Sequence, residues 1–295
     1  MPSSRVRGGR LPGRARSADV AFAAAACIAL AGYNNLAGAQ PWHRRWYTAV
    51  NALAAAVLLA AASASGLTPA DLGLRRDRLR GGFRLGSAAA APVVAAFGLA
   101  ALVPATRPLL NDQRVAGLDR RQLAYQVLLR IPVGTVAWEE IAFRGVLQAA
   151  LRRVLAEPVA TTVGSAVFGL WHIRPTAEAL AVNRLAAGGG ARVFAVAGVA
   201  AGTAGAGALL CLLRERSGSL AAPVLLHLAA NCAGPLASAL ARPPDRGSRR
   251  LALRAKATPA AGQPGGAVRS GFTFGLSPRR RVLRWLRGGW GMGGA

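Results

Sequence analysis

The chain has 295 residues, of which 53% are hydrophobic and only 16% are charged. Ordinary soluble domains are roughly 25% charged and spread that charge over every helix, so whole segments without charge argue against a soluble protein and favour hydrocarbon surroundings. The net charge of +26 is almost all arginine, and the arginines interrupt apolar stretches instead of lining one face of a soluble fold, so nucleic-acid binding is not expected.

The N-terminal 19 residues are polar and basic, and five arginines precede Asp19. We expect a basic cytoplasmic N-terminus, followed by an apolar run from Val20 to Ala37. The basic start, the apolar run and the small residues at 37–39 also fit a cleavable signal peptide. Because further apolar runs follow, a first membrane anchor is the plainer interpretation.

Seven apolar stretches come close to the roughly 20 residues that a helix needs to cross a bilayer. They cover approximately residues 20–37, 47–66, 86–106, 122–150, 158–180, 192–213 and 217–240. The sequence therefore predicts an all-α protein, a polytopic bundle of about seven to eight transmembrane helices within residues 20–240. We expect a multi-pass protein of the cell membrane, with the lipid bilayer as a partner.

Arginine placement indicates an orientation, because basic residues are enriched in cytoplasmic loops. If the N-terminus lies inside, so do the cluster at 75–84 and the pairs at 152/153 and 214/216. Residues 241–295 carry 12 Lys or Arg and one acid, and this Arg/Pro/Gly-rich tail is expected to be disordered. With seven spans and an inside N-terminus, the tail would lie outside the cell. An eighth membrane segment near 271–295 would change the side of the membrane on which the tail lies.

Ionisable residues inside apolar spans are costly and are therefore candidates for function. One cluster reads Trp138-Glu139-Glu140-Ile-Ala-Phe-Arg144. Glu140 and Arg144 are four apart, so they share a helix face and can pair, whereas Glu139 points about 100° away from Glu140. Arg144 can thus neutralise Glu140 and leave Glu139 available for chemistry. A purely structural ion pair is the alternative for Glu140 and Arg144.

Two further clusters each place a pair of residues at i and i+4 on one helix face. They are Phe168 with His172, and His227 with Asn231. Counted from the expected cytoplasmic ends of their spans, Glu139, His172 and His227 lie roughly 15–20 Å deep at about 1.5 Å per residue. Three helices would bring them to nearly one level of the membrane, which indicates a shared buried polar site.

Three other polar residues have no place in this predicted site. Asn34 and Asn35 lie in the first apolar stretch, and no chemistry is assigned to them. His43 lies between Trp42 and Arg44, after the first apolar stretch, and is interpreted as an interfacial loop residue.

A carboxylate, two imidazoles and an amide can activate water and stabilise an oxyanion, which hydrolyses a peptide bond without a covalent intermediate. The same groups allow a second interpretation, a zinc site with Glu139, His172 and His227 as ligands. The chain has no His-Glu-x-x-His motif, no Gly-x-Ser-x-Gly turn and no phosphate-binding loop.

In this order and spacing, the three clusters resemble the CPBP family of intramembrane glutamic endopeptidases. That family includes the type II CAAX prenyl proteases and their abortive-infection and bacteriocin-immunity relatives. Asp71-Leu-Gly-Leu-Arg75 and Glu215-Arg-Ser-Gly-Ser-Leu220 are also similar to the family, so the resemblance covers roughly residues 67–240. The polar tail departs from it.

The resemblance implies a role for each site residue. Glu139 and His172 would activate water, His227 and Asn231 would form the oxyanion site, and the supporting residues would be Glu140, Arg144 and Phe168. The glutamate-type mechanism implies no cofactor and no metal.

The expected function is an intramembrane endopeptidase acting on a membrane-associated peptide or protein. Two alternatives are a non-catalytic membrane scaffold or bacteriocin-immunity protein, and a zinc metallopeptidase on the same residues. A prenylated substrate does not follow from the residues alone.

Overall fold

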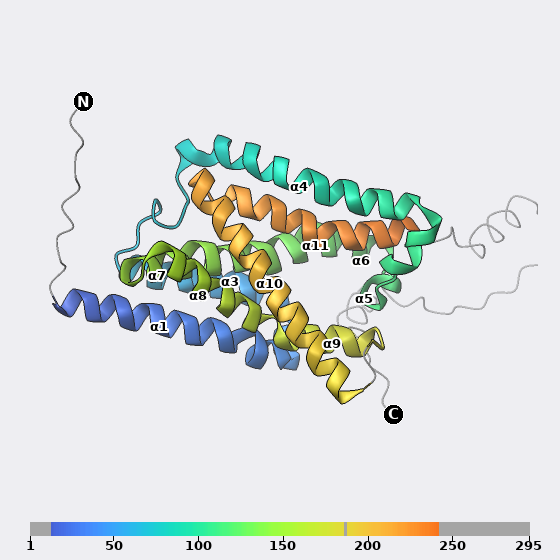
Figure 1. The fold of residues 1–295 in the computed structure, drawn as a ribbon, viewed down its shortest axis with the longest axis horizontal. Coiled ribbons are helices and arrows are strands. Elements are labelled where there is room, and N and C mark those ends of the chain that lie inside the picture. Colours follow the sequence, from blue (N-terminus) through green and yellow to red (C-terminus); the bar gives the residue numbers. More distant parts are fainter. Residues whose placement is uncertain (1–12, 186–187, 242–295) are drawn as a thin grey trace, which may run out of the picture. The chain divides into compact units, whose positions relative to one another are not determined.

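The structure is a computed structural model that describes residues 13–185 and 188–241. The chain is helical in this part, and no strand occurs in it (Figure 1). Most of the expected cytoplasmic N-terminus, residues 1–12, lies outside the described residues. The expected basic tail also lies outside them, apart from Ala241.

Five of the described helices are long and apolar enough to cross a membrane. They are α1 Gly13–Leu36, α3 Tyr47–Ala64, α4 Leu79–Leu102, α10 Gly189–Ser217 and α11 Ala221–Ala241. Large apolar side chains face outward along them, with exposed fractions of 74% at Ile28 and 81% at Phe194. Lipid accepts such a surface and water does not, so the chain is a multi-pass membrane protein.

The helix that carries both candidate glutamates runs without interruption from Arg120 to Val154. Its parts are α6 Arg120–Tyr125, the π-helical segments η4 Gln126–Ala137 and η5 Glu140–Leu147, and α7 Gln148–Val154. π-Helical turns are rare and often occur at functional sites. Charged side chains within it exclude this helix from the five apolar spans. In its middle part they are Arg130, Glu139, Glu140 and Arg144.

The expected span at 158–180 is divided into two helices. α8 covers Glu157–Trp171 and ends before His172, and α9 covers Ile173–Val182. The 15 residues of α8 extend roughly 22 Å, which is shorter than the bilayer core of about 30 Å. By length and composition the structure thus supports five of the seven expected spans, and the count of seven to eight stays a prediction.

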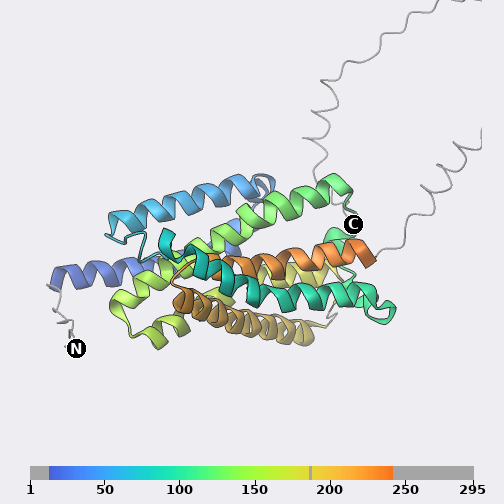
Figure 2. The ribbon, with the colours of Figure 1, turned by 90° about the horizontal axis from the view of Figure 1, so that it is seen from above.

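Glycines of α4 allow close packing against α11 along a seam, the contact of Gly82 and Gly86 with Ser219 and Ala222, and the two helices run side by side (Figures 1 and 2). A Cβ atom on Gly86 would lie 2.8 Å from the backbone of Ala222, and one on Gly82 would lie 2.8 Å from the side chain of Ser219. Only a residue without a side chain permits such an approach. The seam therefore fixes the first turns of α11, the helix that carries His227.

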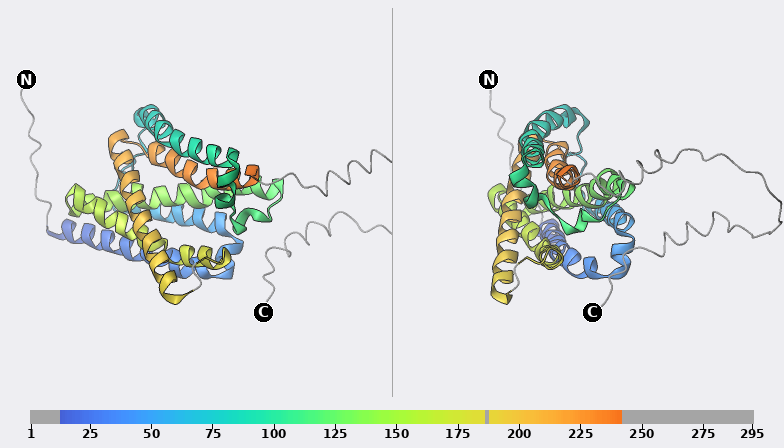
Figure 3. Two further views of the ribbon diagram at one scale, coloured as in Figure 1. Left: turned by 45° about the vertical axis from the view of Figure 1, so that its right-hand side comes forward. Right: turned by 90° about the vertical axis from the view of Figure 1, so that its right-hand side faces the viewer.

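α8, the helix that ends at His172, contacts α1 as well as α10. α10 crosses the bundle obliquely (Figure 3). A Cβ atom on Gly169 would lie 2.6 Å from the carbonyl oxygen of Ala200 in α10, so this crossing also depends on glycine. α1 and α10 thus hold in place the end of α8 that lies next to His172.

Short elements connect these helices. They are η1 Ala37–Ala39, α2 Pro41–Arg45, η2 Arg76–Arg78, η3 Pro104–Leu110 and α5 Gln113–Ala116. The interpretation of His43 as an interfacial loop residue is wrong, because His43 lies on α2 and is 1% exposed. Asn51 of α3 accepts hydrogen bonds on Oδ1 from His43 (3.0 Å) and from the hydroxyl of Tyr33 (2.8 Å). Its Nδ2 donates to the carbonyl of Gly134 in η4 at 2.7 Å, so α1, α2 and α3 support the helix that carries the glutamates.

Candidate active site

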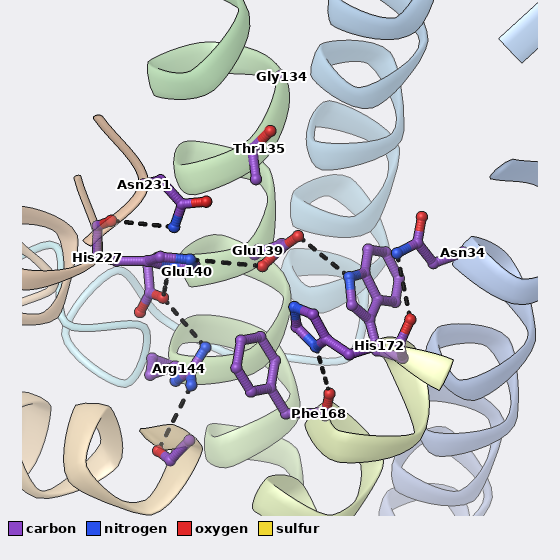
Figure 4. A network of polar contacts seen from close by, with 12 residues as sticks. Asn34, Gly134, Thr135, Glu139, Glu140, Arg144, Phe168, His172, His227 and Asn231 are labelled. Carbon is purple, nitrogen blue, oxygen red and sulfur yellow. Dashed lines mark hydrogen bonds and ion pairs between the residues drawn. The ribbon is translucent and has the colours of Figure 1, made fainter. Parts of the chain in front are cut away.

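Glu140 is the buried centre of the site (Figure 4). Its Oε1 accepts hydrogen bonds from Arg144 Nη1 at 3.1 Å and from His227 Nδ1 at 2.7 Å. The side chains of Glu140 and Arg144 are 0% and 1% exposed, so their ion pair is shielded from solvent. The pairing across one turn is the one expected from the spacing. The bond to His227, which comes from α11, was not predicted.

Glu139 faces a different set of neighbours. Its Oε1 accepts a hydrogen bond from the indole of Trp171 at 3.1 Å. Its Oε2 lies 3.7 Å from His227 Nε2 and has no hydrogen-bond partner among the described residues. Glu139 is 5% exposed. It is therefore a buried carboxylate with one oxygen able to accept a hydrogen bond or a proton.

His172 lies at the junction of α8 and α9. Its ring Nδ1 is 2.8 Å from the carbonyl oxygen of Phe168, one turn earlier. A carbonyl oxygen can only accept, so Nδ1 carries the hydrogen and Nε2 is left as the second ring nitrogen for another partner. Among the described residues no hydrogen bond joins His172 to Glu139. In the view of Figure 4 the His172 ring lies between Phe168 and Glu139.

Phe168 brings the charged and the imidazole groups together. The Arg144 guanidinium lies over its ring, 4.1 Å from the centroid. The ring meets His172 edge-on at 4.6 Å between centroids and His227 at 6.2 Å. An aromatic face attracts a cation, and the geometry with both imidazoles is the edge-to-face arrangement that aromatic rings prefer. Phe168 therefore packs against residues from three different helices.

Asn231 lies one turn beyond His227 on α11. Its Nδ2 donates to the backbone carbonyl of His227 at 3.1 Å. An amide nitrogen has two hydrogens, so this bond leaves one hydrogen and the Oδ1 oxygen for other partners.

The structure thus gathers the residues singled out in the sequence into one cluster of contacts. The cluster runs from Asn231 through His227, Glu140, Arg144 and Phe168 to His172, and Glu139 joins it at His227. Sequence reasoning missed Trp171, which holds Glu139, and the carbonyl of Gly207, which lies 3.5 Å from Arg144 Nη2. The indole N–H of a buried tryptophan usually needs a hydrogen-bond acceptor, so Trp171 beside His172 could have been predicted to bond a polar residue of the site.

Several buried polar atoms have no hydrogen-bond partner among the described residues. Those at or beside the site are Trp138 Nε1, Glu139 Oε2, Glu140 Oε2, Arg144 Nε and Ser165 Oγ. Buried polar groups in proteins are normally paired with protein or water. These atoms are therefore positions at which water or a substrate could bind.

Among the described residues, no group of three or more His, Cys, Asp or Glu side chains is placed to hold a metal ion. That statement covers Glu139, His172 and His227, the ligand set of the zinc alternative.

Residues 121–233 match the family model described as type II CAAX prenyl endopeptidase, Rce1-like. Every predicted site residue, from Glu139 to Asn231, falls inside this range. The range lies within the residues, roughly 67–240, over which the resemblance was expected. No curated protein and no solved structure matches the chain.

Proposed function

Because residues 121–233 match the family model of Rce1-like type II CAAX prenyl endopeptidases, we propose that this chain belongs to that family and is an intramembrane endopeptidase. It hydrolyses a peptide bond of a membrane-associated peptide or protein with water activated by Glu139 and His172. One observation carries the proposal. Two adjacent buried carboxylates have different partners, since Glu140 is bound by the Arg144 guanidinium and by His227, whereas Glu139 accepts a hydrogen bond only from the neutral Trp171 indole among the described residues.

Charge balance supports the assignment of roles. Two carboxylates and one guanidinium leave the buried cluster with one excess negative charge, and an uncompensated buried charge is expensive. A second proton on His227 brings the sum to zero. His227 then donates through Nδ1 to Glu140 and has an Nε2–H group, 3.7 Å from Glu139 Oε2, for a developing oxyanion.

The proposed reaction uses these groups in sequence. Glu139 takes a proton from water while His172 Nε2 holds the same water, and the water oxygen attacks the carbonyl carbon of the peptide bond. The carbonyl electron pair moves to its oxygen, where His227 and Asn231 stabilise the negative charge. Collapse of this intermediate breaks the C–N bond, and Glu139 returns the proton to the departing amine. Glu140, Arg144 and Phe168 hold His227 in place.

Turnover without added metal is the direct test of this proposal. Purified, lipid-reconstituted protein should cleave a fluorogenic membrane-peptide library and retain that activity in excess chelator, since every proposed step uses side chains of the chain itself. Mass spectrometry of the products gives the cleaved bond. Loss of activity in chelator, with recovery on adding zinc, would favour the metallopeptidase alternative. Absence of turnover on every peptide would favour the non-catalytic scaffold or immunity protein.

We further propose that helix 120–154 and the α8–α9 pair also lie in the bilayer, which gives seven spans in the cell membrane. Glu139, Glu140 and Arg144 are tolerable there because they are buried inside the bundle, next to groups of opposite charge or to His227. The arginine distribution then places the loop at 75–84 in the cytoplasm.

Labelling at the two ends of α4 tests this orientation. The side chain of Asp77, before α4, is 58% exposed, and Leu109, after it, is 84% exposed. In a chain whose native cysteines are replaced by Ala, a cysteine at position 77 should resist a membrane-impermeant thiol reagent in intact cells. A cysteine at position 109 should react readily. The reverse pattern would overturn the orientation, and permeabilised cells, in which both positions should react, provide the control.

A further inference from the structure

A proline explains why the helix is divided beside His172. In a continuous helix the amides of Arg174 and Pro175 would bond the carbonyls of Leu170 and Trp171, four residues earlier. Proline has no N–H group, so the Trp171 carbonyl has no such donor. The Arg174 N–H is directed elsewhere, to Asn35 Oδ1 at 3.0 Å. The Trp171 carbonyl therefore needs a partner from outside the helix, whereas the Leu170 carbonyl accepts a backbone N–H at the end of α8 and has a second lone pair for another donor.

Two adjacent asparagines of α1 donate to these two carbonyls. Asn34 Nδ2 donates to the Trp171 carbonyl at 3.2 Å, and Asn35 Nδ2 donates to the Leu170 carbonyl at 2.9 Å. Asn35 Oδ1 in turn accepts the Arg174 N–H. A side-chain amide has both a donor and an acceptor, so Asn35 can bond both sides of the junction. These three bonds join α1 to residues that are more than 130 positions away in the chain.

The junction determines how His172 is held. Its backbone N–H turns back to the carbonyl of Gly169 at 3.1 Å, which leaves the Phe168 carbonyl for the ring Nδ1–H. The adjacent Trp171 is also bound by α1, because Tyr33 stacks on its ring at 5.6 Å and an interplanar angle of 2°. The Trp171 indole in turn bonds Glu139. α1 thus contacts the elements that place both proposed water-activating residues.

We propose that Asn34 and Asn35 are positioning residues of the site, which hold the α8–α9 junction so that His172 keeps its Nδ1–H tautomer and its place near Glu139. This inference rests on the proposed function. Both asparagines lie outside the matched range 121–233, so the site is complete only with the first helix. Neither touches a reacting group, and each acts through the backbone of α8 or α9.

Asparagine-to-alanine variants test the inference against a matched control. Asn34→Ala and Asn35→Ala should each lower kcat about 10- to 100-fold with little change in KM, because misplacing a reacting group by about 1 Å can cost a hundredfold. The control is Asn183→Ala at the other end of α9. Asn183 donates to the Ala179 carbonyl and accepts from the Gln113 amide, both at 3.0 Å. It lies eleven residues after His172, away from the junction. It should keep wild-type kcat.

Histidine NMR gives a readout that does not depend on activity. The chain has only three histidines, so ¹⁵N-histidine labelling yields few signals, and His172→Gln assigns the one of interest. Wild type and Asn183→Ala should show the Nδ1–H tautomer at His172. Asn35→Ala should show a mixture of tautomers.

Pro175→Ala provides a specific rescue. It restores an amide at position 175 that can bond the Trp171 carbonyl, so it should reduce the kcat loss caused by Asn34→Ala. It should not reduce the loss caused by Asn35→Ala, whose partners are Leu170 and Arg174.

Losses no larger than in Asn183→Ala, with an unchanged His172 signal, would overturn the inference and leave the proposed function intact. If wild type itself shows no turnover, the proposed function fails, and the NMR comparison alone decides whether the asparagines position His172.

Discussion

Glu139→Gln is expected to lower kcat by roughly two to four orders of magnitude, the usual contribution of a positioned general base. Glutamine keeps the size of the side chain, and its carbonyl oxygen can still accept the Trp171 hydrogen bond seen at 3.1 Å. It cannot take a proton from water. The variant should therefore fold and bind peptide normally, and the fluorogenic assay on reconstituted protein measures the loss.

The control for this substitution is Glu157→Gln. Glu157 lies on the exposed end of α8, paired with Arg152 at 2.7 Å, and its side chain is 51% exposed. It should retain wild-type turnover. Wild-type turnover by Glu139→Gln would remove Glu139 as the base. An equal loss in both variants would show that the assay responds to charge or yield and not to chemistry.

Arg144→Ala is expected to destabilise the protein by about 3–5 kcal/mol, the cost of leaving one partner of a buried ion pair without compensation. Glu140 is 0% exposed and would keep only His227 as a hydrogen-bond partner among the described residues. The Phe168 ring would also lose the cation 4.1 Å from its centroid. Thermal unfolding in detergent and the yield of folded protein measure the effect, and activity should fall with them.

Arg152→Ala on the same helix is the matched control. Arg152 is 41% exposed and pairs with Glu157 at the surface, where such pairs contribute about 0–1 kcal/mol. The double variant Glu140→Gln/Arg144→Met should regain most of the stability, because it removes both buried charges and keeps an oxygen for His227. Equal melting temperatures for Arg144→Ala and Arg152→Ala would mean that the Glu140 pair does not stabilise the fold.

Hydropathy located five helices that are long and apolar enough to cross a membrane, because each contains a long apolar stretch with few charges. It also located the two remaining stretches, but it could not distinguish a helix that is interrupted from one that is continuous. The junction at His172 depends on the proline at position 175 and on hydrogen bonds from α1, and a sliding average of hydropathy contains neither.

The site shows a similar division between local and distant contacts. The pairing of Glu140 with Arg144, and the different direction of Glu139, follow from helical spacing and are present in the structure. The bond from His227 to Glu140 joins residues 87 positions apart. The roles of Asn34, Asn35 and His43 likewise depend on which helices pack together. Spacing within one segment cannot supply this information.

The order of these contacts along the chain bears on how the protein is made. Glu140 and Arg144 are one turn apart on a single helix, so they can neutralise each other as soon as that helix leaves the ribosome, which lowers the roughly 2.5–3.5 kcal/mol that each charge costs on insertion. Glu139 has no such neighbour. Its indole partner arrives with α8 and its imidazole partner only with α11, the last described helix. The Glu139 carboxylate therefore lacks its imidazole partner until α11 has been made, and the arrival of α11 completes the proposed site.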